Sequence, residues 1–80
     1  MRVGLRLFAS YADALGARSF DVTLPEGAVV RDALEYVRAL PGADRLPPAP
    51  LVAVNAEYAP LDHPLASGDE VAIIPPVAGG

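Results

Sequence analysis

The stretch VVRDALEYVRAL, residues 29–40, is the most strongly patterned part of the chain. Its apolar residues recur three or four positions apart, which places them on one face of an amphipathic helix. These residues are Val30, Ala33, Leu34, Val37 and Leu40. Asp32 lies in the first turn, where a carboxylate meets the positive end of the helix dipole. Pro41 and Gly42 follow directly and are typical of a helix end. We therefore expect one main helix with an apolar face.

Strand-like patterns lie on both sides of this helix. Residues 3–8, 18–24 and 69–75 alternate in the way that is typical of strands with one buried face, and residues 51–55 have a short β-rich composition. The side chains that we expect to point inward are those of Val3, Leu5, Leu7, Phe20, Val22, Leu24, Val71 and Ile73. The sequence therefore predicts four strands.

The segments between these strands differ in kind. Residues 9–17 have the pattern of a short helix that ends at Gly16, whereas residues 57–68 are expected to be irregular. The resulting order is strand, short helix, strand, main helix, strand, irregular segment and strand. This order predicts an α+β fold in which one main helix covers one face of a mixed sheet. We expect a single domain over residues 1–80 with a flexible C-terminal tail, residues 75–80.

The composition excludes several kinds of function. The chain has 52% hydrophobic and 20% charged residues, as globular proteins do, and its net charge of −4 does not suit nucleic-acid binding. It has no cysteine, which rules out disulfides, thiolate-bound metals and a thiol nucleophile. Arg2 and Arg6 interrupt the first apolar run, and no other run is long enough to span a membrane. We expect a cytoplasmic protein with no nucleic-acid or membrane partner, and a basic face on the proteins that it binds.

No set of catalytic residues is evident in the sequence. His63 is the only histidine, and it lies beside a proline in the segment that we expect to be irregular. We interpret it as a loop residue, and we expect no metal site. Asp69 and Glu70 are adjacent in an expected strand, where their side chains point to opposite faces. We therefore predict that the chain is not an enzyme by itself.

The sequence ends with PPVAGG. Pro75 and Pro76 cannot donate hydrogen bonds to a sheet, so the last strand should end there and the two prolines should form a stiff spacer. The residues after this spacer are Val77, Ala78, Gly79 and Gly80. Fully extended, this tail would reach about 20 Å, and glycine has no Cβ to keep it out of a narrow tunnel. The ending therefore favours a tail that enters the active site of another protein, where its carboxylate can react once it is activated by ATP.

An apolar patch is expected beside this tail. Phe8 follows the alternation of the first strand and points away from the core face, as Ile74 does on the last strand. If these two strands are neighbours, Phe8 and Ile74 form an exposed apolar patch, which is typical of a partner-binding site. Tyr58, after the turn at Asn55, is the third candidate for this patch.

Four stretches of the chain are familiar as a set. They are LFASYADALG, LPEGAVVRDAL, VAVNAEY and DHPLASGDEVAIIPPVAGG, which begin at Leu7, Leu24, Val52 and Asp62. Together they resemble the sulfur-carrier family that includes the small subunit of molybdopterin synthase. The similarity covers essentially the whole chain, and the ending is its most specific part. The resemblance implies a β-grasp, ubiquitin-like fold, which agrees with the predicted order of elements.

The resemblance also implies a mechanism. An adenylyltransferase similar to ubiquitin-activating enzymes would use ATP to adenylate the carboxylate of Gly80. A sulfur donor such as a cysteine desulfurase or a rhodanese would then convert it to a thiocarboxylate. The loaded carrier would dock on the large synthase subunit, in a heterotetramer, and donate sulfur to cyclic pyranopterin monophosphate to form molybdopterin. Phe8, Tyr58 and Ile74 match the docking positions of the family, and residues 75–79 would enter the partner. The chain itself would bind no cofactor.

Other acceptors and uses remain open from the sequence. The same sulfur chemistry could serve thiamine synthesis, tRNA thiolation or cysteine synthesis, although the intact segment 8–16 favours molybdopterin. A ubiquitin-like modifier joined through Gly80 to lysines of other proteins, and a plain binding module with an inert tail, are further alternatives. One departure from the family concerns Val29, where a threonine often caps the main helix. Valine cannot form this cap, whose loss costs about 1 kcal/mol.

Overall fold

The computed structural model describes residues 1–45 and 50–75, and five strands in this part of the chain form one sheet. The strands are β1 (Arg2–Leu7), β2 (Ser19–Thr23), β3 (Leu51–Val54), β4 (Glu57–Tyr58) and β5 (Glu70–Ile74). Their order across the sheet is β2-β1-β5-β3-β4. The β1–β5 pair is parallel and every other pair is antiparallel, so the sheet is mixed as predicted.

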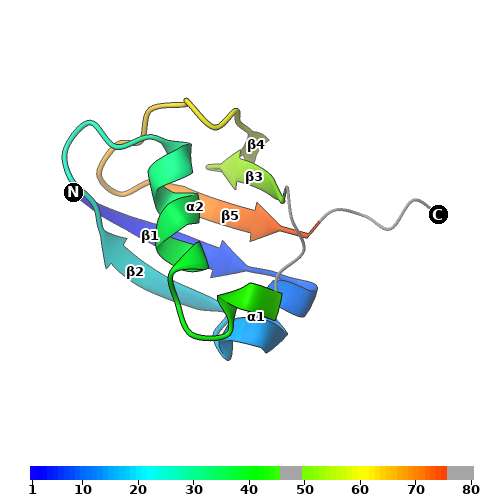
Figure 1. Cartoon of the computed structure of the whole chain (residues 1–80). Coiled ribbons are helices and arrows are strands. Elements are labelled where there is room, and N and C mark those ends of the chain that lie inside the picture. The colour runs from blue at the N-terminus through cyan, green and yellow to red at the C-terminus, as the bar shows by residue number, and fades with distance from the viewer. Residues whose placement is uncertain (46–49, 76–80) are drawn as a thin grey trace.

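The helices lie together on one side of this sheet. They are α1 (Ala9–Leu15), α2 (Val30–Arg38) and the short 3-10 helix η1 (Ala43–Arg45). Figure 1 shows α2 crossing one face of the sheet, with α1 at the end where β1 finishes. Within the described residues no helix has the length and apolar character needed to cross a membrane. The arrangement is the α+β fold with one main helix that the order of elements in the sequence predicts.

The core lies between α2 and the sheet. The side chains predicted to face inward on β1 and β5 are 0–3% exposed, and those of α2 pack against them. Most of the core residues that were predicted from spacing are buried, namely Val3, Leu5, Leu7, Val22, Leu24, Val30, Ala33, Leu34, Val37, Val71 and Ile73. Leu40, predicted to lie on the apolar face of the main helix, follows the end of α2 and is only half-buried. Phe20, also predicted to point inward, is half-buried because β2 is an edge strand. Tyr11 of α1 is fully buried in the same core.

The Asp32 side chain and two backbone carbonyls accept hydrogen bonds at the start of α2, where the Val29 side chain cannot. The Val29 side chain forms no cap, as predicted, but the Asp32 carboxylate accepts a hydrogen bond of 2.8 Å from the Val29 backbone N–H. The N–H groups of Val30 and Arg31 donate to the carbonyls of His63 and Leu61, at 3.0 and 2.8 Å. These bonds satisfy donors that a capping side chain would otherwise serve. Carbonyl groups in the loop after β4 therefore replace part of the hydrogen bonding that a capping threonine would provide.

Several predicted boundaries are wrong by one or two residues, and one strand was missed. The main helix ends at Arg38 rather than at residue 40, and the Leu40 N–H donates to the Val37 carbonyl at 3.1 Å instead of to the carbonyl four residues back. The segment 57–68, predicted to be irregular, begins with β4. This strand has only two residues, too few for an alternating pattern to be visible in the sequence. Gly16 does end α1, in the left-handed conformation with φ 71°.

Candidate functional site

The sheet face opposite α2 carries the candidate site. Because side chains alternate along a strand, the residues next to the buried ones point to this open face. The register places Leu51 beside Ile74, and Phe8 and Ile74 each extend the parallel β1–β5 pair by one residue beyond Leu7 and Ile73. The two strands are neighbours, which is the condition on which the predicted patch depends. The structure thus brings Phe8 and Ile74 together.

The turn after β1 positions Phe8. Its backbone is extended, with φ −126° and ψ 152°, so its side chain continues the alternation of the strand. Ala9 then has φ 48°, which reverses the chain into α1. The Phe8 ring is 39% exposed, and the Arg6 guanidinium carbon lies 5.6 Å from its centre. This cation–π contact holds the ring over the open face.

Leu51 belongs to the same patch and was missed in the sequence. It pairs with Ile74 and is 44% exposed, whereas the next residue, Val52, is buried. The alternation of residues 51–54 indicates that Leu51 and Val52 point to opposite faces. It does not show that β3 lies next to β5, and the place of Leu51 in the patch depends on that pairing. We call Phe8, Leu51, Tyr58 and Ile74 the open-face patch.

Tyr58 reaches the open-face patch through a tight hairpin. Asn55 and Ala56 both have positive φ, 50° and 71°, as a two-residue hairpin turn of type I′ requires. This turn pairs Tyr58 with Ala53 and leaves its ring 73% exposed, the largest exposure among the big apolar side chains described. Three candidates for docking therefore lie on one face, and Leu51 joins them there.

A pair of hydrogen-bonded side chains holds this hairpin to β5. The Asn55 amide donates to Asp69 Oδ1 at 3.0 Å, and the Asn55 side-chain oxygen accepts from the Glu70 backbone N–H at 3.0 Å. Asp69 Oδ2 accepts from the Ala66 backbone N–H at 2.8 Å. Together the Ala66 and Asn55 bonds lower the pKa of the Asp69 carboxyl below its ordinary value. Asp69 and Glu70, which were expected to have no joint role, have structural roles at the start of the strand.

Charged residues flank the open-face patch on the side of β1 and β2. Arg6 lies 3.6 Å from a Glu70 carboxylate oxygen, and Arg2 lies 3.7 Å from one of Asp21. These pairs border a hollow of about 690 Å³ on the open face, whose floor includes Gly4. The open face thus has an apolar part at the end where β5 finishes and a charged part at the other end.

The predicted tail lies mostly outside the described residues. Pro75, half-buried, directly follows β5 and is the last residue described. Pro76, Val77, Ala78, Gly79 and Gly80 fall outside that part of the chain. Because β5 ends at Ile74, the chain leaves the sheet at the open-face patch.

The described residues offer no catalytic constellation. Residues 1–45 and 50–75 contain no group of three or more histidine or carboxylate side chains that could hold a metal ion. His63 lies in the loop after β4, where its backbone bonds to Pro60 and to the start of α2. Burial raises the pKa of Tyr11, which lies in the core. Among the described residues, the open-face patch is the candidate site.

Comparison with known proteins supplies the family. Residues 5–80 match the ThiS family. A protein of Chlamydomonas reinhardtii named molybdopterin synthase sulfur carrier subunit is 36% identical over 83 residues, and the match covers 100% of both chains. The likeness therefore extends over the segments that form the sheet and the helices, and over the tail.

A second kind of relative is similar to the same extent. Small archaeal modifier protein 1 of Haloferax volcanii is 37% identical over 84 residues, covering 94% of this chain and 97% of that protein. The crystal structure of SAMP1 from Haloferax volcanii superposes with a TM-score of 0.85 at 35% identity, over 100% of both chains. The backbone fold is thus shared with ubiquitin-like modifiers as well.

Proposed function

The chain belongs to the ThiS family, and from this premise we propose that it is the sulfur carrier of a molybdopterin synthase. The observation that carries the proposal is the match, along the full length of both chains, to the molybdopterin synthase sulfur carrier subunit of Chlamydomonas reinhardtii. The open-face patch beside the end of β5 supports it, because a carrier needs a docking surface near its reactive end. The chain would supply sulfur and not catalysis.

The proposed reaction takes place at the Gly80 carboxylate. An activating enzyme transfers AMP from ATP to this carboxylate and releases pyrophosphate, which makes the carbonyl carbon electrophilic. The outer sulfur of a donor persulfide attacks that carbon, and AMP leaves. A thiol then reduces the resulting acyl disulfide, which leaves a thiocarboxylate on Gly80. Gly79 and Gly80 suit a narrow passage because neither has a Cβ.

The proposed docking surface is the open-face patch. Phe8, Leu51 and Tyr58 are each at least 39% exposed, and together with Ile74 they form one apolar area on a single sheet face. Such areas on small proteins commonly bind partners. The large synthase subunit would cover this patch and receive the tail, residues 75–80, in its active site. It would also supply the acid and base groups that the described part of this chain lacks.

The first experiment measures the intact mass of the protein through one reaction cycle. The chain is incubated with ATP, an activating enzyme and a sulfur donor, and then with the large synthase subunit and cyclic pyranopterin monophosphate. We expect a mass shift equal to one oxygen replaced by sulfur, which is lost again as molybdopterin forms. A shift that persists would move the acceptor to thiamine, tRNA or another sulfur pathway. No shift, with a known carrier loaded in parallel, would overturn the proposal.

A truncated variant provides the control for this experiment. A chain that lacks Gly80 should unfold at the same temperature as the full chain, since the deletion removes none of the described core residues, but it should acquire no sulfur. Pterin conversion by the truncated chain would contradict the proposed role of Gly80.

A protein modifier is the second candidate, and one observation favours it. The chain is as similar to small archaeal modifier protein 1 as to the sulfur carrier subunit, at 37% and 36% identity. A modifier would form an amide bond between Gly80 and an acceptor amine. Isolating tagged protein from cells under denaturing conditions separates the candidates, because only a modifier appears as larger covalent conjugates whose mass spectra contain a branched peptide ending in Gly80.

A further inference from the structure

The two edges of the sheet are protected to different extents. At one edge β4 has only two residues, and Pro60 follows closely. At the other edge β2 has five residues, contains no proline or lysine, and pairs only with β1 among the described residues. Natural proteins usually shorten or block an exposed edge strand, because its free backbone groups invite another strand. The β2 edge lacks these protections.

The hydrogen-bond pattern shows which β2 groups are free. In an antiparallel pair, residues alternate between those that bond to the partner strand and those that point away from it. The Leu24 and Leu7 N–H groups donate to Met1 and Arg18 at the two ends of the β1–β2 ladder, each at 2.8 Å. The alternation from these ends leaves the backbone N–H and C=O groups of Ser19, Asp21 and Thr23 directed outward. The edge thus offers three donors and three acceptors in register.

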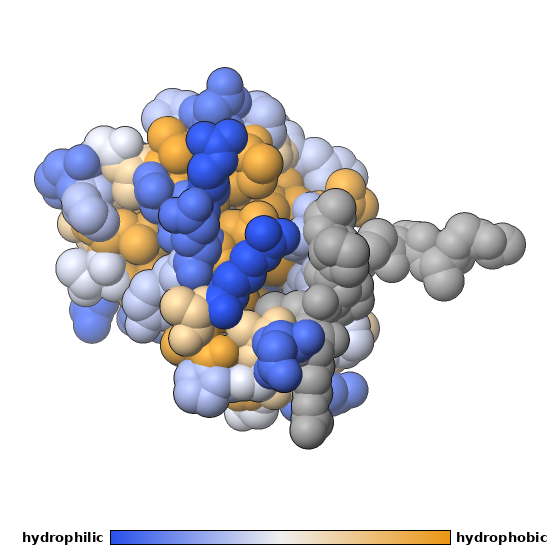
Figure 2. Space-filling model, viewed as in Figure 1, coloured by the Kyte–Doolittle hydropathy of each residue, from blue (hydrophilic) through white to orange (hydrophobic). Residues whose placement is uncertain are grey.

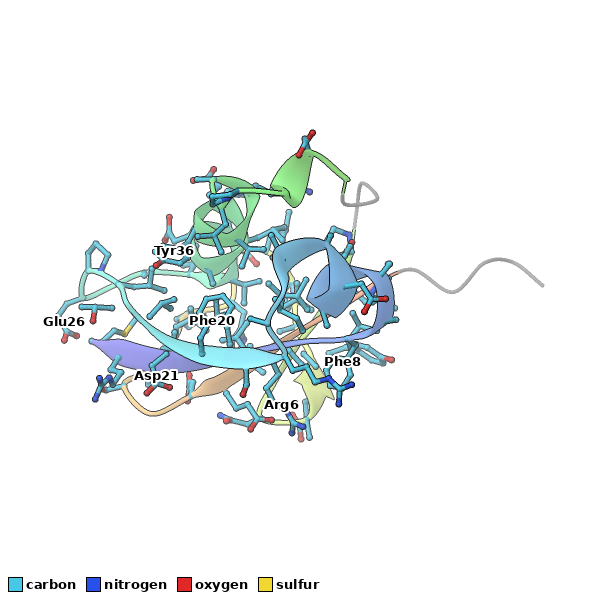
Figure 3. The ribbon with its side chains drawn as sticks, turned by 90° about the horizontal axis from the view of Figure 1, so that it is seen from below. Arg6, Phe8, Phe20, Asp21, Glu26 and Tyr36 are labelled. Carbon is cyan, nitrogen blue, oxygen red and sulfur yellow. The ribbon has the colours of Figure 1, made fainter. Side chains whose placement is uncertain are left out.

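An apolar groove runs beside this edge, on the α2 side. It begins at Leu24, the residue after β2, and continues over Pro25 and Ala28 to Tyr36 of α2, with a volume of about 470 Å³. Tyr36 is 40% exposed. Figure 3 shows Phe20 on the α2 side of β2 and Asp21 on the opposite side. In Figure 2, apolar surface appears on both sides of the hydrophilic band that follows α2.

The charge around the groove is negative. Glu26, Asp32 and Glu35 line it, and no arginine does among the described residues. Glu26 lies 3.6 Å from the Met1 nitrogen, and Asp32 accepts the Val29 N–H, so Glu35 is the carboxylate most available to a ligand. Opposite charge on a partner would be attracted here. The free strand edge favours an extended ligand, the groove favours apolar side chains, and the acidic wall favours basic ones.

A second copy of the chain fits this edge poorly. If two β2 strands paired in antiparallel fashion about their centre, Asp21 would lie directly opposite Asp21 of the other copy. Like charges in that position destabilise a strand pair. Both copies would also bring a net charge of −4. The charge complementarity therefore favours a different protein as the occupant.

We propose that the β2 edge and the groove beside α2 bind an extended segment of a partner protein, in which apolar residues alternate with others and arginine or lysine lies near the ends. The segment adds a strand to the sheet by pairing with Ser19, Asp21 and Thr23. Its apolar side chains pack on Phe20 and Tyr36, and a basic residue meets Glu35. This site lies on the edge and helix side, so it stays accessible when a partner covers the open-face patch.

The test uses a capped nine-residue peptide in which valine and threonine alternate and arginine lies near each end. Binding is followed by NMR on the full chain. We expect hydrogen exchange of the Ser19, Asp21 and Thr23 amides to slow on binding. Two control peptides carry N-methyl groups on either all valines or all threonines. Because only alternate N–H groups face β2, one control should bind and the other should not.

Two charge-reversal variants complete the test. Glu35→Arg should weaken peptide binding about fivefold, as expected for a partly exposed charge pair. Glu57→Arg changes the net charge equally at the opposite edge and should change affinity less than twofold. Equal effects of the two variants, protection at other amides, or no binding at millimolar peptide would overturn the proposal. So would concentration-dependent dimerisation that protects the same three amides, because it would make a second copy the occupant.

Discussion

Ile73 and Ile74 are adjacent on β5, have the same side chain, and lie on opposite faces of the sheet. Ile73 is 1% exposed beneath α2, whereas Ile74 is half-buried on the open face beside Leu51. The same contrast runs across the sheet, with buried Leu7 at the end of β1 next to exposed Phe8, and buried Val52 next to exposed Leu51 on β3.

The contrast separates two uses of apolar side chains. On the covered face they contribute to folding, because α2 already removes them from water. On the open face the apolar side chains still contact water, so the free energy of burying them is available to a partner that covers them. Residue type alone does not distinguish the two uses, but the face does. Changes on the covered face should therefore lower stability, and changes on the open face should lower binding.

The largest effect is expected from substituting this isoleucine pair. Ile73→Ala should lower the free energy of unfolding by about 3 kcal/mol, since it removes a buried side chain and leaves a cavity. Ile74→Ala should lower it by less than about 1 kcal/mol, because its side chain is already partly in water. Urea denaturation of both variants measures the difference. Equal losses would mean that the open face is as important for folding as the covered one.

The next effect concerns the helical layer over the covered face. Gly42 has φ 91°, and a Cβ there would lie 2.5 Å from the Ala14 carbonyl oxygen. Gly42→Ala should therefore cost about 2 to 3 kcal/mol, from both backbone strain and this clash. Gly27→Ala is the control, because φ is 85° but nothing lies within 4 Å of the added Cβ. Its cost should be about 1 kcal/mol, from the backbone alone. A similar thermal shift for both variants would argue against close packing of α1 on the loop after α2.

The binding side of the comparison is tested with two aromatic residues of similar exposure. Phe8 and Tyr36 are 39% and 40% exposed, but they lie on opposite sides of the molecule. Phe8→Ala should weaken binding to the large synthase subunit about tenfold, as for a contact residue at the centre of an interface. Tyr36→Ala should leave it unchanged. Calorimetric titration measures both affinities, and the melting temperature should fall little for Phe8→Ala. A large fall would mean that Phe8 belongs to the core.

The smallest effect is a pH dependence at the hairpin that carries Tyr58. The lowered pKa of Asp69 means that its ionised form stabilises the fold. This stabilisation is present at pH values well above the ordinary pKa of 3.8. It is lost as the pH falls through 3.8 toward the lower pKa that Asp69 has in the folded state. Asp69→Ala should therefore be less stable than the wild type at pH 7, and the gap should narrow by pH 3. Urea midpoints of the two proteins at both pH values measure the gap, and a gap of the same size at pH 3 and pH 7 would contradict this role of Asp69.

Much of the fold could be predicted from local patterns. The inward residues of β1 and β5, the buried face of α2 and the turn at Gly16 follow from spacing and from the conformational freedom of glycine. Other features had no local signal. β4 is too short to show alternation, and the bonds from Arg31 and Val30 to Leu61 and His63 join segments about thirty residues apart in the sequence.

The candidate site was only partly predictable for the same reason. Phe8 and Ile74 were identified from the alternation along their strands and Tyr58 from its place after the turn at Asn55, and all three lie on one face. Leu51 was missed because its role depends on which strand lies next to β3. The free edge of β2 likewise depends on the order of strands.

The sequence by itself determined the direction in which each side chain points along its own strand or helix, since the backbone sets periods of 2.0 and 3.6 residues. It also determined the acidic charge and the absence of cysteine. Only the tertiary structure decided which strands are neighbours, which face α2 covers and which edge stays open. Backbone donors and acceptors are the same in every residue except proline, so strand pairing depends on the packing of the whole domain and cannot be read from any one segment.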